Sequence, residues 1–146
     1  MEESLSLLGK FKKEFECEEV DIRTYSPLTL AFVGDCIYDL LIRTVLVERG
    51  NRNPEHLHKK KSAMVKAGAQ AAMAEFLKDD LTEEEMSVYT RGRNAKSYTT
   101  AKNASVTDYR KATGFEALMG YLYLTDREDR MIELVKRALE GLDMMR

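Results

Sequence analysis

Apolar residues recur at steps of three and four along most of the chain, which is the spacing of an α-helix. The clearest such stretch follows Ser26-Pro27, a predicted helix start, and runs to about Arg49, before Gly50. Because its apolar positions fall on most sides of the helix, we expect it at the centre of the fold or at a partner interface. Gly34, in its middle, costs about 1 kcal/mol relative to alanine and indicates a close backbone approach or a change of helix direction.

Further segments repeat this spacing, so the sequence predicts one all-α domain of about six helices. A short first helix is expected over Ser4–Glu16, and the acidic stretch Glu14–Asp21 leads away from it. A third helix is expected from Asn53-Pro54 to about Lys78, with many alanines in its second half. No segment alternates with the period of two that a half-buried strand requires.

The second half of the chain carries the remaining helical signals. Thr82 and Glu85 form a capping-box pattern, so a fourth helix is expected to begin there and to end around Arg91-Gly92. The polar, basic segment Arg93–Thr107 is interpreted as a loop before a fifth helix. Asp126 is expected to cap a last helix. The inward positions of that last helix are apolar, namely Met131, Leu134, Val135, Ala138 and Leu142.

Composition limits the class of protein. Hydrophobic residues make up 44% of the chain and charged residues 33%, which is ordinary for a soluble globular domain and too apolar for a disordered one. The sequence has no apolar run near the roughly 20 residues of a membrane helix, and it begins without a signal-peptide pattern, so we expect a cytoplasmic protein that does not enter a membrane. Cys17 and Cys36 lack metal-binding or CxxC spacing and are expected to be buried free thiols.

Charge is unevenly distributed along the chain. The net charge of −2 argues mildly against a nucleic-acid partner. Between Arg91 and Lys111, however, six basic residues stand against one acidic residue, Asp108. A second basic cluster comprises Lys59–Lys61 and Lys66. A lysine run is more often a solvated helix face than a phosphate-binding surface, and both interpretations stay open here.

Two acidic residues, Asp35 and Glu116, lie within apolar helical stretches, where a charge is costly unless it is paired or metal-bound. Each has small neighbours, namely Ala31 and Gly34 for the first and Ala112, Ala117 and Gly120 for the second. Small neighbours leave room for a hydrated ion, and hard cations such as Mg²⁺ prefer carboxylate oxygens. Helix-surface acids or ordinary ion pairs explain the same spacing, so the residues alone leave both readings open.

Other polar residues have simpler explanations. Asp39 is expected to pair with Arg43, four residues later on the same helix, rather than to join Asp35. His56 and His58 begin a polar helix without a partnered Ser, Cys or Asp, so we expect no catalytic role for them. The sequence contains no glycine-rich phosphate loop, which argues against nucleotide-driven chemistry.

The strings around the two acids resemble the ribonuclease III family. LAFVGDCIY, at 30–38, is similar to the signature helix of its catalytic domain, and FEALMG, at 115–120, is similar to its second acidic helix. RGRNAKS, at 91–97, and YLYL, at 121–124, resemble the Mini-III members, which lack a double-stranded-RNA-binding domain. The resemblance implies a single catalytic domain over residues 1–146, with its core over about 26–142.

The resemblance also implies an activity, that of an endoribonuclease cleaving double-stranded RNA with Mg²⁺, or with Mn²⁺ as a substitute. A metal-bound water would attack the phosphodiester and leave 5′-phosphate and 3′-hydroxyl ends. Asp35 and Glu116 are implied as the catalytic, metal-binding carboxylates. The implied RNA-binding residues are Arg91, Arg93, Lys96 and Lys102. The implied role is maturation of the ends of the large-subunit (23S) ribosomal RNA precursor.

Partners follow from the same resemblance. A symmetric homodimer through the helix around 28–47 would supply two sites, one for each RNA strand. A ribosomal protein that presents the substrate is a second implied partner, because the chain shows no separate RNA-binding domain.

The chain departs from the usual family pattern at three acidic positions. Leu28, Ala31 and Thr113 stand where the family usually carries acids. The number of metal ions is therefore left open between one and two. A noncatalytic RNA-binding or ribosome-assembly module on the same fold stays an alternative, and so does a helical adaptor that binds proteins through Glu14–Asp21. The basic segment Arg91–Lys102 favours RNA over the adaptor.

Overall fold

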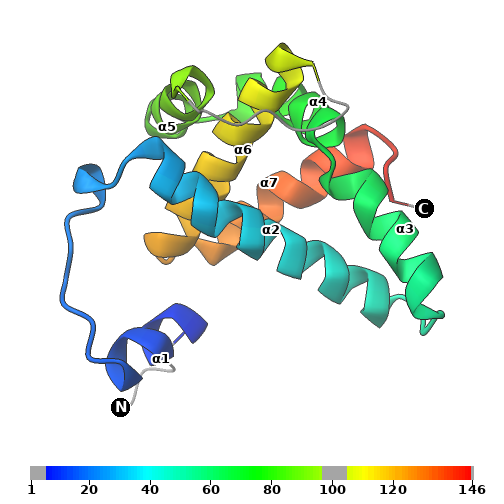
Figure 1. Cartoon of the computed structure of the whole chain (residues 1–146), viewed down its shortest axis with the longest axis horizontal. Coiled ribbons are helices and arrows are strands. Elements are labelled where there is room, and N and C mark those ends of the chain that lie inside the picture. The colour runs from blue at the N-terminus through cyan, green and yellow to red at the C-terminus, as the bar shows by residue number, and fades with distance from the viewer. Residues whose placement is uncertain (1–5, 97–104, 146) are drawn as a thin grey trace.

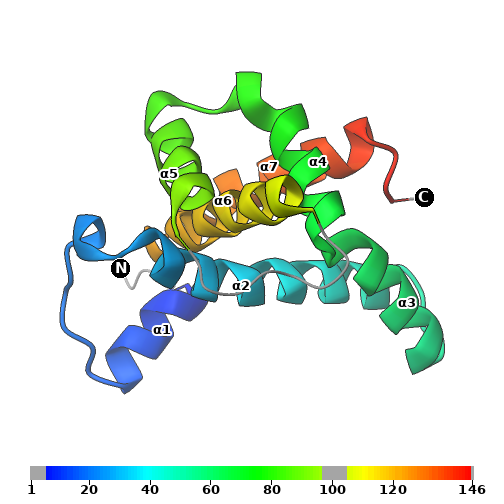
Figure 2. The same cartoon turned by 45° about the horizontal axis from the view of Figure 1, so that its top comes forward.

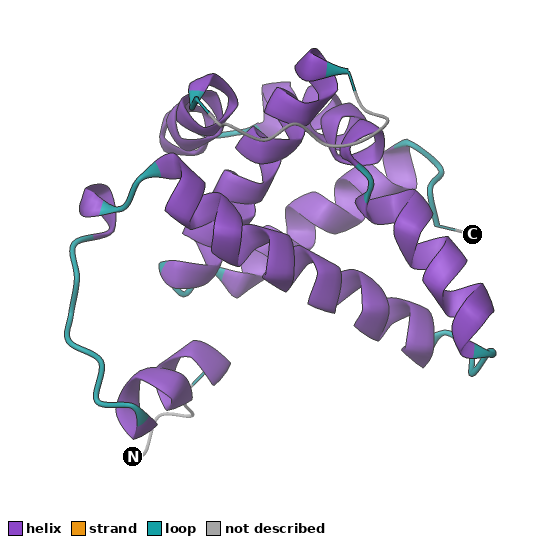
Figure 3. Cartoon of the chain, viewed as in Figure 1, coloured by secondary structure: helices purple, strands orange, loops and turns teal. Residues whose placement is uncertain are grey.

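The computed structural model describes residues 6–96 and 105–145. Within these two ranges the regular elements are all helical (Figures 1 and 3), which confirms the predicted all-α class. The helices are α1 (Leu7–Glu14), α2 (Pro27–Glu48), α3 (Pro54–Val65), α4 (Ala67–Leu77), α5 (Glu83–Asn94), α6 (Val106–Leu124) and α7 (Glu128–Gly141). Two short 3₁₀ turns are present as well, η1 (Ile22–Thr24) and η2 (Lys78–Asp80).

Helix α6 forms the centre of the fold. Its residues from Ala112 to Tyr123 are buried with the single exception of Glu116. Helices α2, α4 and α5 pack around it (Figure 2). Phe115 of α6 meets Tyr38 of α2 edge to face, with ring centroids 5.2 Å apart. For the helix expected at the centre of the fold or at a partner interface, the first alternative therefore holds for one side of α2, whereas the other side is exposed.

The exposed side of α2 carries several large apolar side chains. Phe32 is 81% exposed, and Leu28, Leu40 and Val47 are each exposed by 40% or more. Helix α1 lies apart from α4–α7, at the end of the extended acidic segment, in both views (Figures 1 and 2). Leu7 and Phe11 of α1 line a groove together with Leu28 and Phe32.

The predicted third helix is in fact two helices. Lys66 is extended, with ψ of 155°, and separates α3 from α4. The side chain of Gln70 donates from Nε2 to the Val65 carbonyl oxygen at 2.7 Å, across this break. Lysine between alanine-rich segments gives no local signal to stop a helix, so the prediction of one continuous helix was wrong.

Helix α5 continues through Arg93 and Asn94, where a loop was predicted. Gly92 was interpreted as its end, but this glycine is a packing position. A Cβ at Gly92 would lie 2.8 Å from Ala117 Cβ and 2.9 Å from Gly114 Cα. The absence of a side chain therefore lets α5 approach α6 closely.

Two further sequence predictions need correction. Asp126 does not cap the last helix: it adopts φ of 61°, and α7 begins after Arg127 without a side-chain cap. Cys17 and Cys36 are free, as expected, but both are exposed rather than buried.

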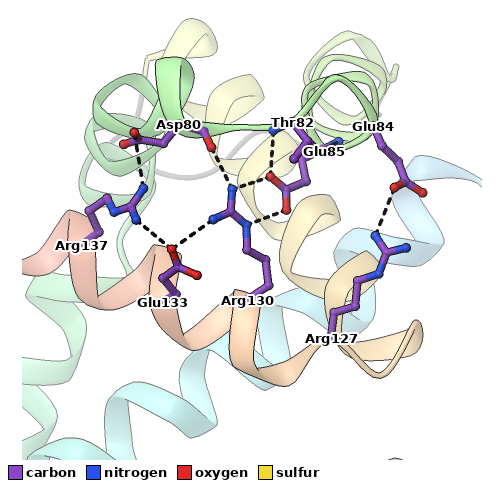
Figure 4. A network of polar contacts seen from close by, with 8 residues as sticks. All are labelled: Asp80, Thr82, Glu84, Glu85, Arg127, Arg130, Glu133 and Arg137. Atoms are coloured by element: carbon purple, nitrogen blue, oxygen red, sulfur yellow. Dashed lines mark hydrogen bonds and ion pairs between the residues drawn. The ribbon is translucent and has the colours of Figure 1, made fainter.

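The start of α5 is fixed to α7 by charged residues (Figure 4). The predicted capping box is confirmed, since Thr82 and Glu85 exchange hydrogen bonds of 2.9 and 3.1 Å. Arg130 donates to both carboxylate oxygens of Glu85, at 2.8 Å each, and to the Asp80 carbonyl oxygen. These hydrogen bonds, led by that from Arg130, hold the pKa of Glu85 below its ordinary value. Helix α5, which carries two of the predicted RNA-binding arginines, is thereby anchored to the last helix.

Within the described ranges, no helix combines the length and the apolar character needed to cross a bilayer.

Candidate active site

Two glycines allow α2 and α6 to cross with their main chains in contact. A Cβ at Gly34 would lie 1.7 Å from the carbonyl oxygen of Glu116, and a Cβ at Gly120 would lie 1.9 Å from that of Leu30. Neither position has room for a side chain. The close approach predicted at Gly34 is confirmed, and its partner is Glu116, the second acid singled out in the sequence.

This crossing places Asp35 and Glu116 in one groove of about 1020 Å³. Asp35 is exposed and Glu116 half-buried. Thr113 and Tyr109, one and two turns before Glu116 on α6, line the same groove. The acids that the sequence placed on separate helices therefore share a solvent-open site.

The environment of Glu116 disfavours its charged form. Burial raises the pKa of Glu116 to about 8, with further contributions from a hydrogen bond and from charge repulsion involving Asp35. Hydrogen bonding from the Gln70 amide acts in the opposite direction and lowers this pKa. Two carboxyl groups close enough to repel each other as anions are the kind of pair that a cation stabilises.

Gln70 is a buried polar residue of α4 that sequence reasoning missed. Its side chain is only 3% exposed. Nε2 donates to the Val65 carbonyl, whereas Oε1 is buried without a hydrogen-bond partner among the residues that the structure describes. A glutamine inside an alanine-rich helix looks like a surface position in the sequence, and only its burial distinguishes it.

Asp39 does not join the site. It pairs with Arg43 at 2.6 Å, as predicted, and with Lys61 of α3 at 3.7 Å. Lys61 therefore has a structural partner, while Lys59 and Lys60 are exposed. His56 and His58 are exposed on α3 and do not line the groove.

Three of the four predicted RNA-binding residues lie at the end of α5. Arg91 and Lys96 are exposed. Arg93 is half-buried, with its guanidinium carbon 5.8 Å from the ring centroid of Tyr89. Lys102 lies outside the described residues. The three described cations lie in the last turn of a helix or just beyond it, where positive charge is also favoured by the helix dipole.

Because Leu28 and Thr113 replace acids that the family usually carries, few side chains in the groove could bind a metal ion. Leu28 and Thr113 both line the groove. Thr113 donates its hydroxyl to the Tyr109 carbonyl oxygen at 3.0 Å. Across residues 6–96 and 105–145, no group of three or more His, Cys, Asp or Glu side chains is arranged to hold a metal ion. A cation in this groove would have two carboxylates as its charged protein ligands.

Comparison with known proteins gives consistent matches. The Ribonuclease III domain matches residues 28–127, a range that includes both acids. The chain is 50% identical over 122 residues to Mini-ribonuclease 3 of Enterococcus faecalis, covering 82% of this chain and 92% of that protein. It is 41% identical to Mini-ribonuclease 3 of a Thermoanaerobacter species over 138 residues, covering 94% and 97% of the two chains.

A solved structure agrees with these matches. The crystal structure of protein FN1578 from Fusobacterium nucleatum superposes with a TM-score of 0.75 at 33% identity, covering 84% of this chain and 98% of that one. Domain, sequence and fold thus agree over the helices that carry Asp35 and Glu116. The chain belongs to the ribonuclease III family and is an endoribonuclease.

Proposed function

We propose that this endoribonuclease cleaves double-stranded RNA with Mg²⁺ held between Asp35 and Glu116. The observation that carries the proposal is the α2–α6 crossing, which brings the two acids into one groove from distant parts of the chain. The glycines of this crossing, Gly34 and Gly120, lie close in sequence to the two acids, whereas nearby Asp39 is used in ordinary ion pairs.

The residues present fit a magnesium ion. Mg²⁺ prefers oxygen ligands, keeps several of its waters and commonly takes only one or two carboxylates from the protein. Asp35 offers an exposed carboxylate, and Glu116 offers one whose charge is disfavoured without a cation. When bound, the ion supplies an activated water and stabilises charge on the leaving oxygen. Mn²⁺, with similar ligand preferences, is proposed as a substitute, and two carboxylates set no firm limit between one ion and two.

The chain's own residues then have separate roles. Asp35 and Glu116 would hold the ion. Attack of water on the phosphorus, with the P–O3′ bond breaking, would leave 5′-phosphate and 3′-hydroxyl ends. Arg91, Arg93, Lys96 and Lys102 contact phosphates of the duplex. Such contacts position the RNA without reading its sequence. A-form RNA is recognised largely by its shape, its phosphates and its 2′-hydroxyls, so little sequence preference is expected from these contacts.

Cleavage of both strands requires two sites, and we propose that a homodimer supplies them. The exposed side of α2 is the proposed contact, because Phe32 is 81% exposed beside Asp35 and further apolar side chains extend along the helix. A two-fold contact through α2 would place one groove on each protomer near the other.

The proposed substrate is the precursor of large-subunit (23S) ribosomal RNA, cleaved near its ends in the cytoplasm. This part of the proposal rests on the resemblance to the Mini-III ribonucleases. The few cations at the end of α5 give limited affinity for a generic duplex, so a ribosomal protein that presents the RNA is proposed as a further partner.

The test uses purified protein, a labelled RNA duplex and Mg²⁺. Wild type is expected to cut the duplex and leave 5′-phosphate ends, whereas Asp35→Asn and Glu116→Gln are expected to lose cleavage and remain folded. Asp39→Asn is the matched control, an acid one turn from Asp35 that should leave cutting intact. If wild type binds the duplex without cutting it, the noncatalytic module replaces this proposal. Normal cutting by both Asp35 and Glu116 variants would overturn the site assignment.

A further inference from the structure

A second pocket lies at the opposite end of α2 from α5 (Figures 1 and 2). It has a volume of about 300 Å³ and is lined by residues from the end of α2, from α3 and from the segment after α7. None of these residues lines the groove of Asp35 and Glu116. Arg49, the residue that caps the end of α2, lies about 20 Å along the helix from Asp35, at a rise of about 1.5 Å per residue. The pocket is therefore separate from the candidate active site.

Four basic side chains surround this second pocket, namely Arg49, Arg52, His56 and Lys60. All four are exposed. Among the residues that the structure describes, no acidic side chain lines the pocket, and none of the four basic residues has an ion pair. The arginines and the lysine carry positive charge at neutral pH, so the pocket is a concentration of positive charge without a counter-charge from the described chain.

The basic residues next to the pocket are paired instead. Lys59 Nζ lies 4.0 Å from Glu55 Oε1, and Lys61 Nζ lies 3.7 Å from Asp39 Oδ1. Positive charges that are gathered without a counter-charge repel one another and lower the stability of the fold. An anion bound among them removes that cost. Arginine and lysine are common partners of phosphate groups, so the cluster points to a phosphate-bearing ligand.

Most of the remaining lining is apolar. Met64 is 4% exposed, while Leu46, Leu57, Met144 and Met145 are half-buried. A phosphate ion needs no such surface, whereas the aromatic base of a nucleotide packs well against leucine and methionine. The volume lies at the lower end of the range of small-ligand sites, about 300–1,000 Å³, and is too small for a duplex. The lining and the volume together fit one nucleotide.

We propose that this pocket binds a single nucleotide, with its phosphate among the four basic side chains and its base against the leucine and methionine side chains. The inference goes beyond the proposed function, because it requires neither a metal ion nor cleavage. Two sources present the same phosphate and base to an endoribonuclease. One is an unpaired nucleotide beside the duplex of its substrate, and the other is a free mononucleotide.

The first experiment measures binding of AMP by isothermal titration calorimetry, at low salt and without divalent cations. Lys60→Gln and Arg52→Gln are each expected to raise the dissociation constant about tenfold or more, the effect of losing one charge-assisted hydrogen bond. The thermal midpoint without AMP is expected to stay the same or to rise, because charge repulsion around the pocket decreases. A purely structural role predicts the reverse pattern, a lowered midpoint with unchanged AMP affinity.

Lys59→Gln is the matched control. Lys59 is the preceding residue on α3 and is equally exposed, but it does not line the pocket. This variant changes the net charge of the protein by the same amount as Lys60→Gln and is expected to bind AMP as wild type does. Equal weakening of AMP binding in Lys59→Gln and Lys60→Gln would overturn the inference, because it would show only a general effect of charge.

The contact with the base is tested separately. In protein labelled with ¹³C at the methionine methyl groups, AMP is expected to shift the NMR signals of Met64 and Met144. The signal of Met119, which is buried in α6 and does not line the pocket, is expected to stay in place. Inorganic phosphate is expected to bind about tenfold more weakly than AMP, because it has no base to bury. Equal affinities for phosphate and AMP would overturn the assignment of a nucleotide.

A last comparison distinguishes the two sources of the nucleotide. Fluorescence anisotropy without Mg²⁺ compares a blunt RNA duplex with the same duplex carrying a single-stranded extension. If the nucleotide belongs to the RNA, the extension strengthens binding and Lys60→Gln removes the difference. If the nucleotide is free, the two RNAs bind alike while AMP binding still depends on Lys60. Duplex binding that depends on Lys60 without any AMP binding would overturn the inference and indicate a contact with the duplex backbone. A wild type that binds AMP here but does not cut RNA would overturn only the proposed function.

Discussion

Gly34 and Glu116 touch through their main chains, so closely that a Cβ on Gly34 would come within 1.7 Å of the Glu116 carbonyl oxygen. Gly34→Ala is therefore expected to push α2 away from α6 and to lower the free energy of unfolding by about 3 kcal/mol, the upper range for overpacking a core. Urea unfolding followed by circular dichroism measures this change. Mn²⁺ binding is expected to fall together with stability, because the two acids separate.

Gly68→Ala is the control for this substitution. Gly68 also lies in a helix, but a Cβ there would meet only Asp108 Oδ2, at an ordinary distance of 3.7 Å. Stability is expected to stay the same or to rise slightly, by less than about 1 kcal/mol. If Gly34→Ala and Gly68→Ala changed the free energy of unfolding equally, the close approach of α2 and α6 would not be what makes Gly34 necessary.

Some of these features can be predicted from the sequence because their causes are local. Ser26 accepts from the Thr29 N–H at 3.1 Å, and Thr82 and Glu85 form their box, as short-range capping patterns indicate. Asp35 and Glu116 could likewise be singled out in the sequence, from their small neighbours and from the family resemblance. That they meet in one groove is a property of the α2–α6 crossing, which no local pattern encodes.

The sequence predictions that were wrong concern features that depend on contacts between residues far apart in the sequence. The break at Lys66 depends on packing around α4 and on the bond from Gln70 to Val65, neither of which a helical period reveals. Gly92 has the local appearance of a helix end, yet it is required by contact with Ala117. Gln70 was missed because an amide in an alanine-rich helix has the same pattern whether it faces water or the core.

A second prediction concerns the Arg130–Glu85 pair. The pKa of Glu85 is lowered in the folded state, chiefly by the hydrogen bond from Arg130. Its contribution to stability is therefore present above the unfolded value of about 4.5 and is lost as pH falls through the lower folded value. The free energy of unfolding of wild type is expected to decrease from pH 5 downward, and Arg130→Met is expected to flatten this decrease.

At neutral pH, Arg130→Met is also expected to lower the free energy of unfolding by about 3 kcal/mol, because it leaves the buried Glu85 carboxylate without its partner. Lys136→Met is the comparison. Lys136 lies on the same helix in an exposed ion pair with Glu140 of 3.9 Å, and such pairs contribute about 0–1 kcal/mol. Similar losses in both variants would show that Arg130 acts no differently from a surface charge.

A third prediction concerns RNA binding by α5. Arg91→Ala, at an exposed position, is expected to weaken duplex binding and to reduce the slope of log affinity against log salt by about one unit, the effect of one lost phosphate contact. Fluorescence anisotropy without Mg²⁺ measures binding while cleavage is absent. Arg23→Ala removes an exposed arginine of η1 that is paired with Asp21, and it should leave the slope unchanged. An unaltered slope in Arg91→Ala would exclude a phosphate contact at that residue.

A fourth prediction tests the α2 surface. Phe32→Asp places a charge at the most exposed large apolar side chain of α2 and is expected to convert a dimer into a monomer. Light scattering after size-exclusion chromatography measures the mass directly. Val106→Asp, at another exposed apolar residue outside α2, is expected to keep the mass of wild type. A monomeric wild type at micromolar concentration would refute the proposed dimer.

The α2–α6 crossing has a consequence for how the enzyme is made. One acid emerges early in synthesis and the other only after most of the chain has been translated, and each needs the other's helix to take its place in the groove. If the two acids act as proposed, a nascent chain or a fragment that stops before α6 carries half of a site and is expected not to cut RNA. Synthesis of α6 would then be required before RNA can be cut, with no separate inhibitor needed.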